Sequence, residues 1–128
     1  CTEETWRRAG LEGASESESI AYCEEIFAAD LEGHPLLPNR SSWIQFPTLR
    51  CARWHHENVV LLGDAAHTAH FSIGSGTKMA LEDAIALSAA LTQHPGDVPA
   101  ALAAYEAAQQ PVVGRIQTAA QQSLEWFE

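Results

Sequence analysis

The sequence predicts an α+β fold with an N-terminal helix, one to three short strands and two long C-terminal helices. Three observations support this prediction. Apolar residues recur at helical spacing near the N-terminus, a β-branched and aliphatic run lies at residues 59–62, and most of the chain after residue 76 has helical apolar periodicity. Segregation of strands in the middle and helices at the ends is typical of the α+β class.

The first predicted helix follows Ser15, because Ser15 and Glu18 have the spacing of a capping box. Gly33 is expected to end it, since glycine accepts the left-handed conformation found after helices. The apolar face of this helix comprises Ile20, Cys23, Phe27 and Leu31.

Two segments are predicted to be strands. Residues 43–53 are rich in aromatic and β-branched side chains, although Pro47 confines such a strand to a sheet edge or a bulge. Residues 55–58 form a polar turn in this prediction, and residues 59–62 form a buried strand.

The second helix is predicted to begin near Ser75 or Thr77 and to stop at Pro95 and Gly96. Its buried face is predicted to be Thr77, Ala80, Leu81, Ala84, Leu87, Ser88 and Leu91.

Asp97 is a plausible cap for a last, long amphipathic helix over residues 98–127, with Pro99 in its first turn. Pro111 lies inside this helix, where its ring should kink it. The apolar face is predicted to be Leu102, Tyr105, Val112, Ile116, Ala120, Leu124 and Phe127.

Composition limits the function. A chain of 128 residues with 46% hydrophobic content suits one domain with a modest core, and it contains no apolar run of the roughly 20 residues that span a bilayer. The net charge of −10 argues against nucleic acid and anionic membranes as partners. Cys1, Cys23 and Cys51 lack metal-like spacing and suit reduced thiols in a cytoplasmic protein.

The most informative segment spans residues 58–84. A strand is followed by Gly63 and Asp64, then by a Gly/Ser-rich loop over residues 72–76 that opens a helix. A carboxylate in such a turn can accept hydrogen bonds from sugar hydroxyls, and the free amides at a helix start stabilise negative charge. This arrangement is typical of a site for a polar, electron-rich cofactor.

The sequence GDAAH, followed by Gly74 and Gly76 and then by the acidic pair Glu82-Asp83, resembles the second flavin-binding motif of single-component, FAD-dependent aromatic monooxygenases. The segments HTAHFSIGSGTK, NRSSWIQF and SLEWFE are similar to the subgroup that hydroxylates aromatic CoA thioesters, such as salicylyl-CoA and anthraniloyl-CoA. In the wider family a Pro-Pro pair and an Asn stand where this chain has His70, Phe71 and Lys78. That departure favours the CoA-thioester subgroup.

The resemblance implies an enzyme that hydroxylates an aromatic ring with O2, FAD and either NADH or NADPH. It places FAD against Gly63, Asp64 and Ala65, with Asp64 at the ribityl chain. It also places backbone amides from Gly74, Ser75, Gly76, Thr77 and Lys78 beside the flavin pyrimidine.

The resemblance also implies a division of the chain. Residues 1–57 would be the tail of a substrate domain, and residues 58–128 the C-terminal part of the FAD-binding domain. The family binds the ADP half of FAD with a GxGxxG turn. This chain has no such turn and begins at Cys1, so we expect it to be a C-terminal portion of a hydroxylase. We also expect the catalytic residues and the basic groups that bind CoA to lie outside it.

Several residues have a simpler structural interpretation. Glu82 and Asp83 lie in the first turns of a helix, where acids are favoured anyway, and we expect both to be structural. Asp64, His67 and His70 share a metal-like spacing, but they lie in a turn, so no metal is expected.

In the resemblance, His67 supports the turn, whereas His70 and Phe71 face the substrate. By default Lys78 is a surface lysine of the helix. Trp43, Trp54 and Trp126 are expected to be core or interface anchors.

Two other functions remain open from the sequence. One is a flavoprotein of the same fold with different chemistry, such as an epoxidase, halogenase or dehydrogenase. The other is a non-enzymatic module that binds partners. We also expect this piece to self-associate, through the helix over residues 98–127, because apolar faces would be left uncovered.

Overall fold

The computed structural model describes residues 1–127. They form two compact units, an N-terminal unit of residues 1–45 and a C-terminal unit of residues 46–127. No helix within these described residues is both long and apolar enough to cross a membrane. The predicted α+β class, with a small sheet and two long C-terminal helices, is confirmed.

The N-terminal unit contains α1 (Glu3–Arg8), α2 (Glu16–Ile26) and α3 (Ala28–Leu31). The predicted capping box is present at the start of α2. The Ser15 hydroxyl accepts a hydrogen bond of 3.3 Å from the Glu18 amide, and the Glu18 carboxylate accepts one of 2.7 Å from the Ser15 amide. The predicted helix therefore begins where expected, but it is divided between α2 and α3.

Exposed polar contacts, rather than a core, hold the rest of the N-terminal unit. The extended segment after α3 returns along α2, where the Ser41 amide donates to Glu16 over 2.7 Å and the Trp43 indole donates to Ser19 over 3.0 Å. Leu11 is the one buried side chain of residues 1–45. This unit consequently depends on local helix signals for its stability.

The predicted strand over residues 43–53 is wrong. This segment is extended but contains only an isolated antiparallel bridge between Arg50 and His67, beside which the Cys51 amide donates to the Ala66 carbonyl over 3.1 Å. An extended segment becomes a strand only where a second extended segment pairs with it over several residues, and here the paired stretch is too short.

A hairpin of two short strands, β1 (His55–His56) and β2 (Val59–Val60), lies where a turn and a strand were predicted. The strands are antiparallel with His55 opposite Val60, so the residues predicted as turn include one whole strand. Val59 is 61% exposed, so the prediction of a buried strand over residues 59–62 is also wrong in part.

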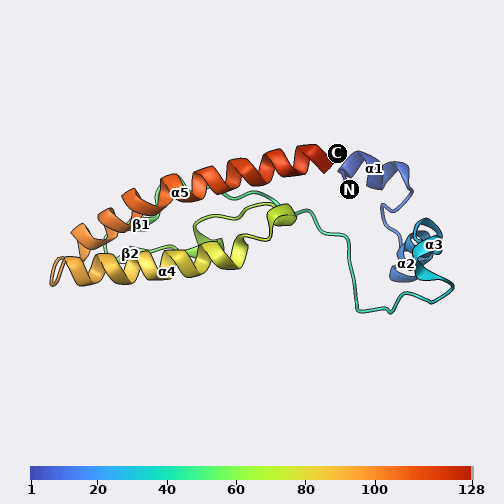
Figure 1. The fold of residues 1–128 in the computed structure, drawn as a ribbon, viewed down its shortest axis with the longest axis horizontal. Helices are drawn as coiled ribbons and strands as arrows, with labels where there is room; N and C mark the ends of the chain where they lie inside the picture. The colour runs from blue at the N-terminus through green and yellow to red at the C-terminus, as the bar shows by residue number, and fades with distance from the viewer. Residues whose placement is uncertain (128) are drawn as a thin grey trace. The chain divides into compact units, whose positions relative to one another are not determined.

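Two long helices, α4 (Gly76–Gln93) and α5 (Val98–Phe127), run antiparallel and side by side (Figure 1). Their ends agree with the sequence signals. Ser75 precedes α4, which stops before Pro95, and the Asp97 carboxylate caps α5 by accepting an amide hydrogen bond of 3.1 Å. α5 continues through Pro111.

The predicted buried face of α4 is wrong. Met79, Asp83 and Ala90 are buried, whereas Leu81 is 62% and Leu91 42% exposed. Small and apolar residues lie on both sides of α4, so the pattern alone does not select a face. The side that packs on α5 is the one that carries Asp83.

The predicted face of α5 is largely correct for the residues whose burial the structure describes, which do not include Phe127. Leu102, Tyr105 and Ala120 are buried, and Val113 and Gln117 join them. This face contributes most of the helical side of the core.

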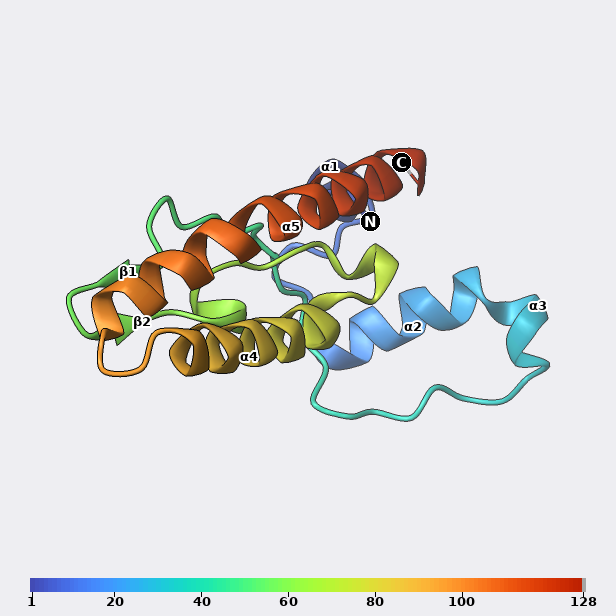
Figure 2. The same ribbon diagram turned by 60° about the vertical axis from the view of Figure 1, so that its left-hand side comes forward.

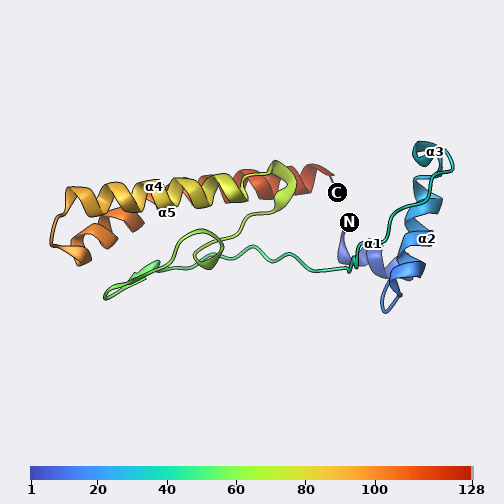
Figure 3. The same ribbon diagram turned by 90° about the horizontal axis from the view of Figure 1, so that it is seen from below.

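The hairpin and the loops form a second layer on one side of the helix pair, as the two turned views show (Figures 2 and 3). Trp54, from the segment before β1, lies 2% exposed in the core between the layers, with Met79 from α4 and Tyr105 from α5. Aromatic and sulfur side chains of this size supply most of the apolar burial in the unit.

Glutamine side chains of α5 hold the irregular segments by their backbone. The Gln117 amide group donates to the carbonyls of Leu49 and Thr68, over 2.8 and 2.7 Å. Gln110 donates to the Ala52 carbonyl over 3.2 Å. These bonds are made to carbonyl groups of segments that belong to no sheet.

Candidate functional site

The turn η1 (Gly63–Ala65) follows β2 and packs on α4. Gly63 is buried with φ of 58°, and a Cβ atom there would lie 3.2 Å from the Cβ of Ala80. A left-handed conformation and a close approach to a helix both favour glycine. The predicted sequence of strand, acidic turn, glycine loop and helix is therefore present.

Asp64 is exposed at this turn. Within residues 1–127, no protein group donates a hydrogen bond to its carboxylate, whereas the turn around it is held firmly. An ionised carboxylate accepts hydrogen bonds only, so Asp64 is available to hydroxyl groups of a ligand.

The N-terminus of α4 is also available. Gly74 adopts φ of 63°, and Ser75 precedes the helix without a side-chain capping bond. Gly76, Thr77 and Lys78 are exposed, and the first turn contains no acidic residue. Their amides have no partner within the helix, so they favour an electron-rich ligand group.

The Lys78 side chain forms an ion pair with Glu82 one turn along α4. Lys78 is 64% exposed in its side chain, which agrees with the surface lysine expected from the sequence. Glu82 also contributes its backbone carbonyl, which accepts a hydrogen bond of 3.0 Å from Gln109 on α5.

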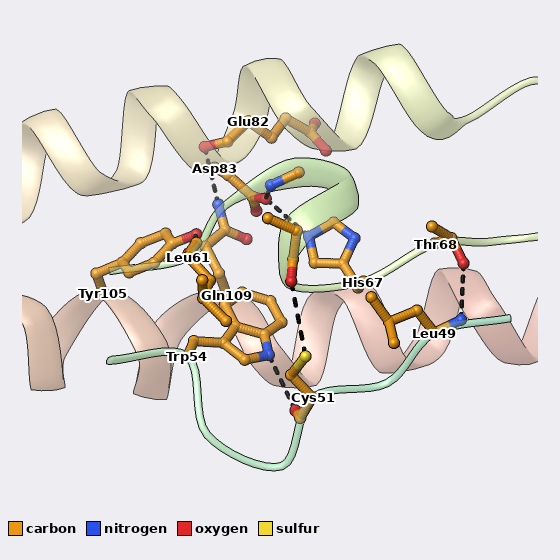
Figure 4. A network of polar contacts seen from close by, with 12 residues as sticks. Leu49, Cys51, Trp54, Leu61, His67, Thr68, Glu82, Asp83, Tyr105 and Gln109 are labelled. Carbon is orange, nitrogen blue, oxygen red and sulfur yellow. Dashed lines mark hydrogen bonds and ion pairs between the residues drawn. The ribbon is translucent and has the colours of Figure 1, made fainter. Parts of the chain in front are cut away.

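His67 and Asp83 form a buried pair beneath the turn (Figure 4). The distance from His67 Nε2 to Asp83 Oδ2 is 2.7 Å, and the two side chains are 2% and 0% exposed. The same carboxylate oxygen accepts a hydrogen bond of 2.8 Å from the Gly63 amide. The expectation that His67 supports the turn and Asp83 is structural agrees with this geometry.

Aromatic rings enclose this pair. The Trp54 ring lies 5.0 Å from the His67 ring, and Tyr105 lies 5.8 Å from Trp54, between centroids. Burial, together with the negative charge of Asp83, raises the pKa of the Tyr105 phenol, which donates to the Leu61 carbonyl over 3.3 Å (Figure 4). Asp83 thus lies in an apolar setting, where its hydrogen bonds are strong.

An exposed aromatic cluster follows the turn. His70 stacks on Phe71 with 4.3 Å between ring centroids, and the ring of Phe46 packs edge-on against Phe71 at 5.7 Å. Phe71 begins η2 (Phe71–Ile73) and is 68% exposed, and Phe46 is 44% exposed. Such rings offer a flat apolar surface to an aromatic ligand.

Asp64, His67 and His70 do not come together as a ligand set, because His67 is buried beneath the turn at 2% exposed whereas Asp64 is exposed on it. In the part of the chain that the structure describes, no three His, Cys, Asp or Glu side chains gather as a metal site.

Three contributors to the site were not assigned from sequence: Phe46, Trp54 as the ring beneath His67, and the contact between Asp83 and Gly63. Phe46 lies in the segment that was predicted to be a strand, and Trp54 directly follows it, so their partners could not be inferred. Asp83 had one usable signal, since an acid that falls on the packed side of a helix requires a donor.

A family model described as an FAD binding domain matches residues 8–120. The chain belongs to the FAD-binding domain family. The Asp64 carboxylate can accept hydrogen bonds from hydroxyl groups, and the uncapped amides at the N-terminus of α4 can stabilise negative charge. The chemistry of these residues therefore fits such a cofactor.

Similar proteins include three bacterial enzymes. The salicyloyl-CoA 5-hydroxylase of a Streptomyces species is 48% identical over 98% of this chain. The 3-hydroxy-4-methyl-anthranilyl-[aryl-carrier protein] 5-monooxygenase of Streptosporangium sibiricum is 49% identical over 84%, and the protodeoxyviolaceinate monooxygenase of Chromobacterium violaceum is 43% identical over 100%. The chain spans 26%, 30% and 34% of these relatives.

Proposed function

We propose that this chain is part of an FAD-dependent monooxygenase that hydroxylates an aromatic ring. The proposed substrate is an aromatic acyl-CoA thioester, and the reductant is NADH or NADPH. Similarity to relatives named salicyloyl-CoA 5-hydroxylase and an aryl-carrier-protein 5-monooxygenase supports this class. The observation that carries the proposal is the exposed Asp64, whose carboxylate accepts no hydrogen bond from the described residues. It lies on a turn that packs on α4, whose N-terminus is uncapped.

In this proposal the Asp64 carboxylate accepts hydrogen bonds from ribityl hydroxyls, with Gly63 and Ala65 shaping the turn. The amides of residues 74–78 lie beside the pyrimidine edge of the flavin and stabilise negative charge there. When bound, FAD supplies the redox and oxygen-transfer chemistry. The residues of this chain bind and orient the cofactor.

We propose that His70 and Phe71 face the substrate ring. Their stacked rings and the exposure of Phe71 support this role. In the full-length protein, Phe71→Ala should raise the apparent KM or uncouple NAD(P)H oxidation from hydroxylation, because the ring would be held less well. The measurement is the fraction of NAD(P)H consumed that appears as hydroxylated product. Gln122→Ala, at an exposed position of α5, is the control.

We further propose that residues 1–57 are the tail of a substrate domain and residues 58–128 the C-terminal part of the FAD-binding domain. A CoA thioester carries several phosphates, whereas this chain has a net charge of −10. Basic groups that bind CoA are therefore proposed to lie in other parts of the full-length protein.

We propose self-association of the 128-residue chain. Large exposed apolar side chains support it, notably Leu81 and Ile85 on α4 and Val59 on β2, at 62%, 69% and 61% exposed. Exposed apolar residues lie on α4 as well as on α5, the helix through which the sequence predicts self-association. Light scattering of the protein at tens of micromolar tests this proposal, and a clean monomer would contradict it.

A cytoplasmic location is also proposed, supported by three cysteines without disulfides.

The decisive experiment uses the full-length protein. Aromatic CoA thioesters should stimulate its NAD(P)H oxidation and become hydroxylated. Asp64→Ala should weaken FAD binding by about 1.5–3 kcal/mol, the usual size of lost hydrogen bonds to a charged group. Asp64→Asn, which keeps one acceptor oxygen, should lose less. Full FAD occupancy in Asp64→Ala would contradict the assignment of the site.

A further inference from the structure

One oxygen atom of Asp83 holds two points of the cofactor turn. Asp83 Oδ2 accepts from the Gly63 amide over 2.8 Å and lies 2.7 Å from Nε2 of His67. Gly63 and His67 are the first and last residues of GDAAH, and Asp64 lies between them. A single side chain of α4 therefore holds both ends of the segment that presents Asp64.

The surroundings leave this segment little freedom. Asp83 and His67 are 0% and 2% exposed, and Trp54 covers the imidazole at 5.0 Å between ring centroids. Water does not compete for these hydrogen bonds, so they are stronger than bonds at the surface. Gly63 also lies so close to Ala80 that a Cβ atom at this position would be 3.2 Å from the Ala80 Cβ.

The other atoms of the pair show where the interaction ends. Within the described residues, neither Asp83 Oδ1 nor His67 Nδ1 has a hydrogen-bond partner, although both are buried. Asp83 makes no contact with the exposed side where a cofactor would lie. Its two hydrogen bonds within residues 1–127 both go to the turn, so it acts on a ligand through the turn.

We propose that Asp83 is a positioning residue for the cofactor site: it fixes the Asp64 turn to α4, so that the Asp64 carboxylate and the helix N-terminus present a single preformed site to the flavin. This inference rests on the proposed function. Preformed geometry matters because a ligand that must first order its site binds more weakly.

The test compares two substitutions of Asp83 in the full-length protein, with FAD titrated into the apoprotein and binding followed by flavin fluorescence. Asp83→Ala removes the acceptor and should weaken FAD binding at least about tenfold, the loss expected from one hydrogen bond to a charged group. Asp83→Asn can place its amide oxygen where Oδ2 lies and accept both bonds. It should retain affinity within about threefold. Equal losses in both variants would overturn the proposal.

A double-substitution cycle separates positioning from a general loss of stability. If Asp83 acts through Asp64, then Asp83→Ala should weaken FAD binding in the natural background but by less than about threefold in an Asp64→Ala background. Losses that multiply independently would overturn the proposal, because they would show that Asp83 does not act through Asp64.

Asp97→Ala is the matched control for stability. It removes the cap of α5, at the other end of the helix pair, and should lower the urea midpoint while leaving FAD affinity unchanged. If destabilisation alone weakened FAD binding, this control would also lose affinity, and the proposal would fail. If Asp64→Ala leaves FAD affinity unchanged, both the proposed function and the positioning role fail. If Asp64→Ala weakens FAD binding and Asp83→Ala does not, only the positioning role fails.

Discussion

The two units of this chain are stabilised in different ways. Residues 1–45 contain three short helices, two of which have side-chain N-caps, and one buried side chain, Leu11. Residues 46–127 contain little sheet, but Trp54, Met79 and Tyr105 are buried between a helix pair and the loops. Local signals are thus sufficient to form helices, whereas holding a functional turn in place requires burial from several segments.

Two tryptophans provide the largest contrast. Trp54→Ala should lower the free energy of unfolding by about 3–5 kcal/mol, because it empties a buried ring site and removes the indole bond to the Cys51 carbonyl. Trp43→Ala should lower it by about 1 kcal/mol or less, since Trp43 is 44% exposed and makes one polar contact. Urea unfolding followed by far-UV circular dichroism measures both. Equal effects would mean that the two units are stabilised alike.

The next contrast concerns Glu106, a carboxylate of α5 that binds the hairpin, and its contribution to stability depends on pH. Burial raises the pKa of Glu106, but hydrogen bonds from the amides of Trp54 and His55 and from the His55 ring together hold it below its ordinary value of 4.5. A lowered pKa stabilises the folded state above the ordinary value, and this contribution is lost as the pH falls through the folded value.

Glu106→Gln should therefore destabilise the chain by about 1–3 kcal/mol at pH 7 and by progressively less below pH 4.5. Urea midpoints of both proteins between pH 7 and pH 3 give the difference. Glu125→Gln, on the same helix but exposed, is the control and should show little dependence. A difference that stays constant with pH would refute the role of ionised Glu106.

The capping box should show the smallest and most local effect. Ser15→Ala removes the hydroxyl that accepts from the Glu18 amide, and it should cost about 1 kcal/mol. Hydrogen exchange should accelerate in α2 and remain unchanged in α4. Faster exchange in α4 as well would show that the C-terminal unit depends on this cap.

Helix ends were predictable because their signals lie within a few residues. Ser15, Ser75 and Asp97 each stand where a helix begins, and Pro95 follows the end of α4. The motif around Asp64 was predictable for the same reason, since strand, turn and helix follow one another in sequence. Its roles toward a cofactor remain proposals.

The remaining features depend on contacts between distant segments. Residues 43–53 have strand propensity, but only Arg50 finds a bridge partner, so propensity alone misled. The face of α4 was misassigned because its packed side carries Asp83, which a search for apolar periodicity excludes. The bond from Asp83 to Gly63 joins residues 20 positions apart, for which no local pattern exists.

The glutamines of α5 have a consequence for how such a site can diversify. Gln110 and Gln117 bind backbone carbonyls of Leu49, Ala52 and Thr68, which every amino acid possesses. The path of the segment that carries Phe46 is therefore set by bonds that do not depend on its own side chains. Mutations there can remodel the aromatic surface while the course of the chain is kept, so we expect tolerance to substitution to be high at Phe46 and low at the two glutamines.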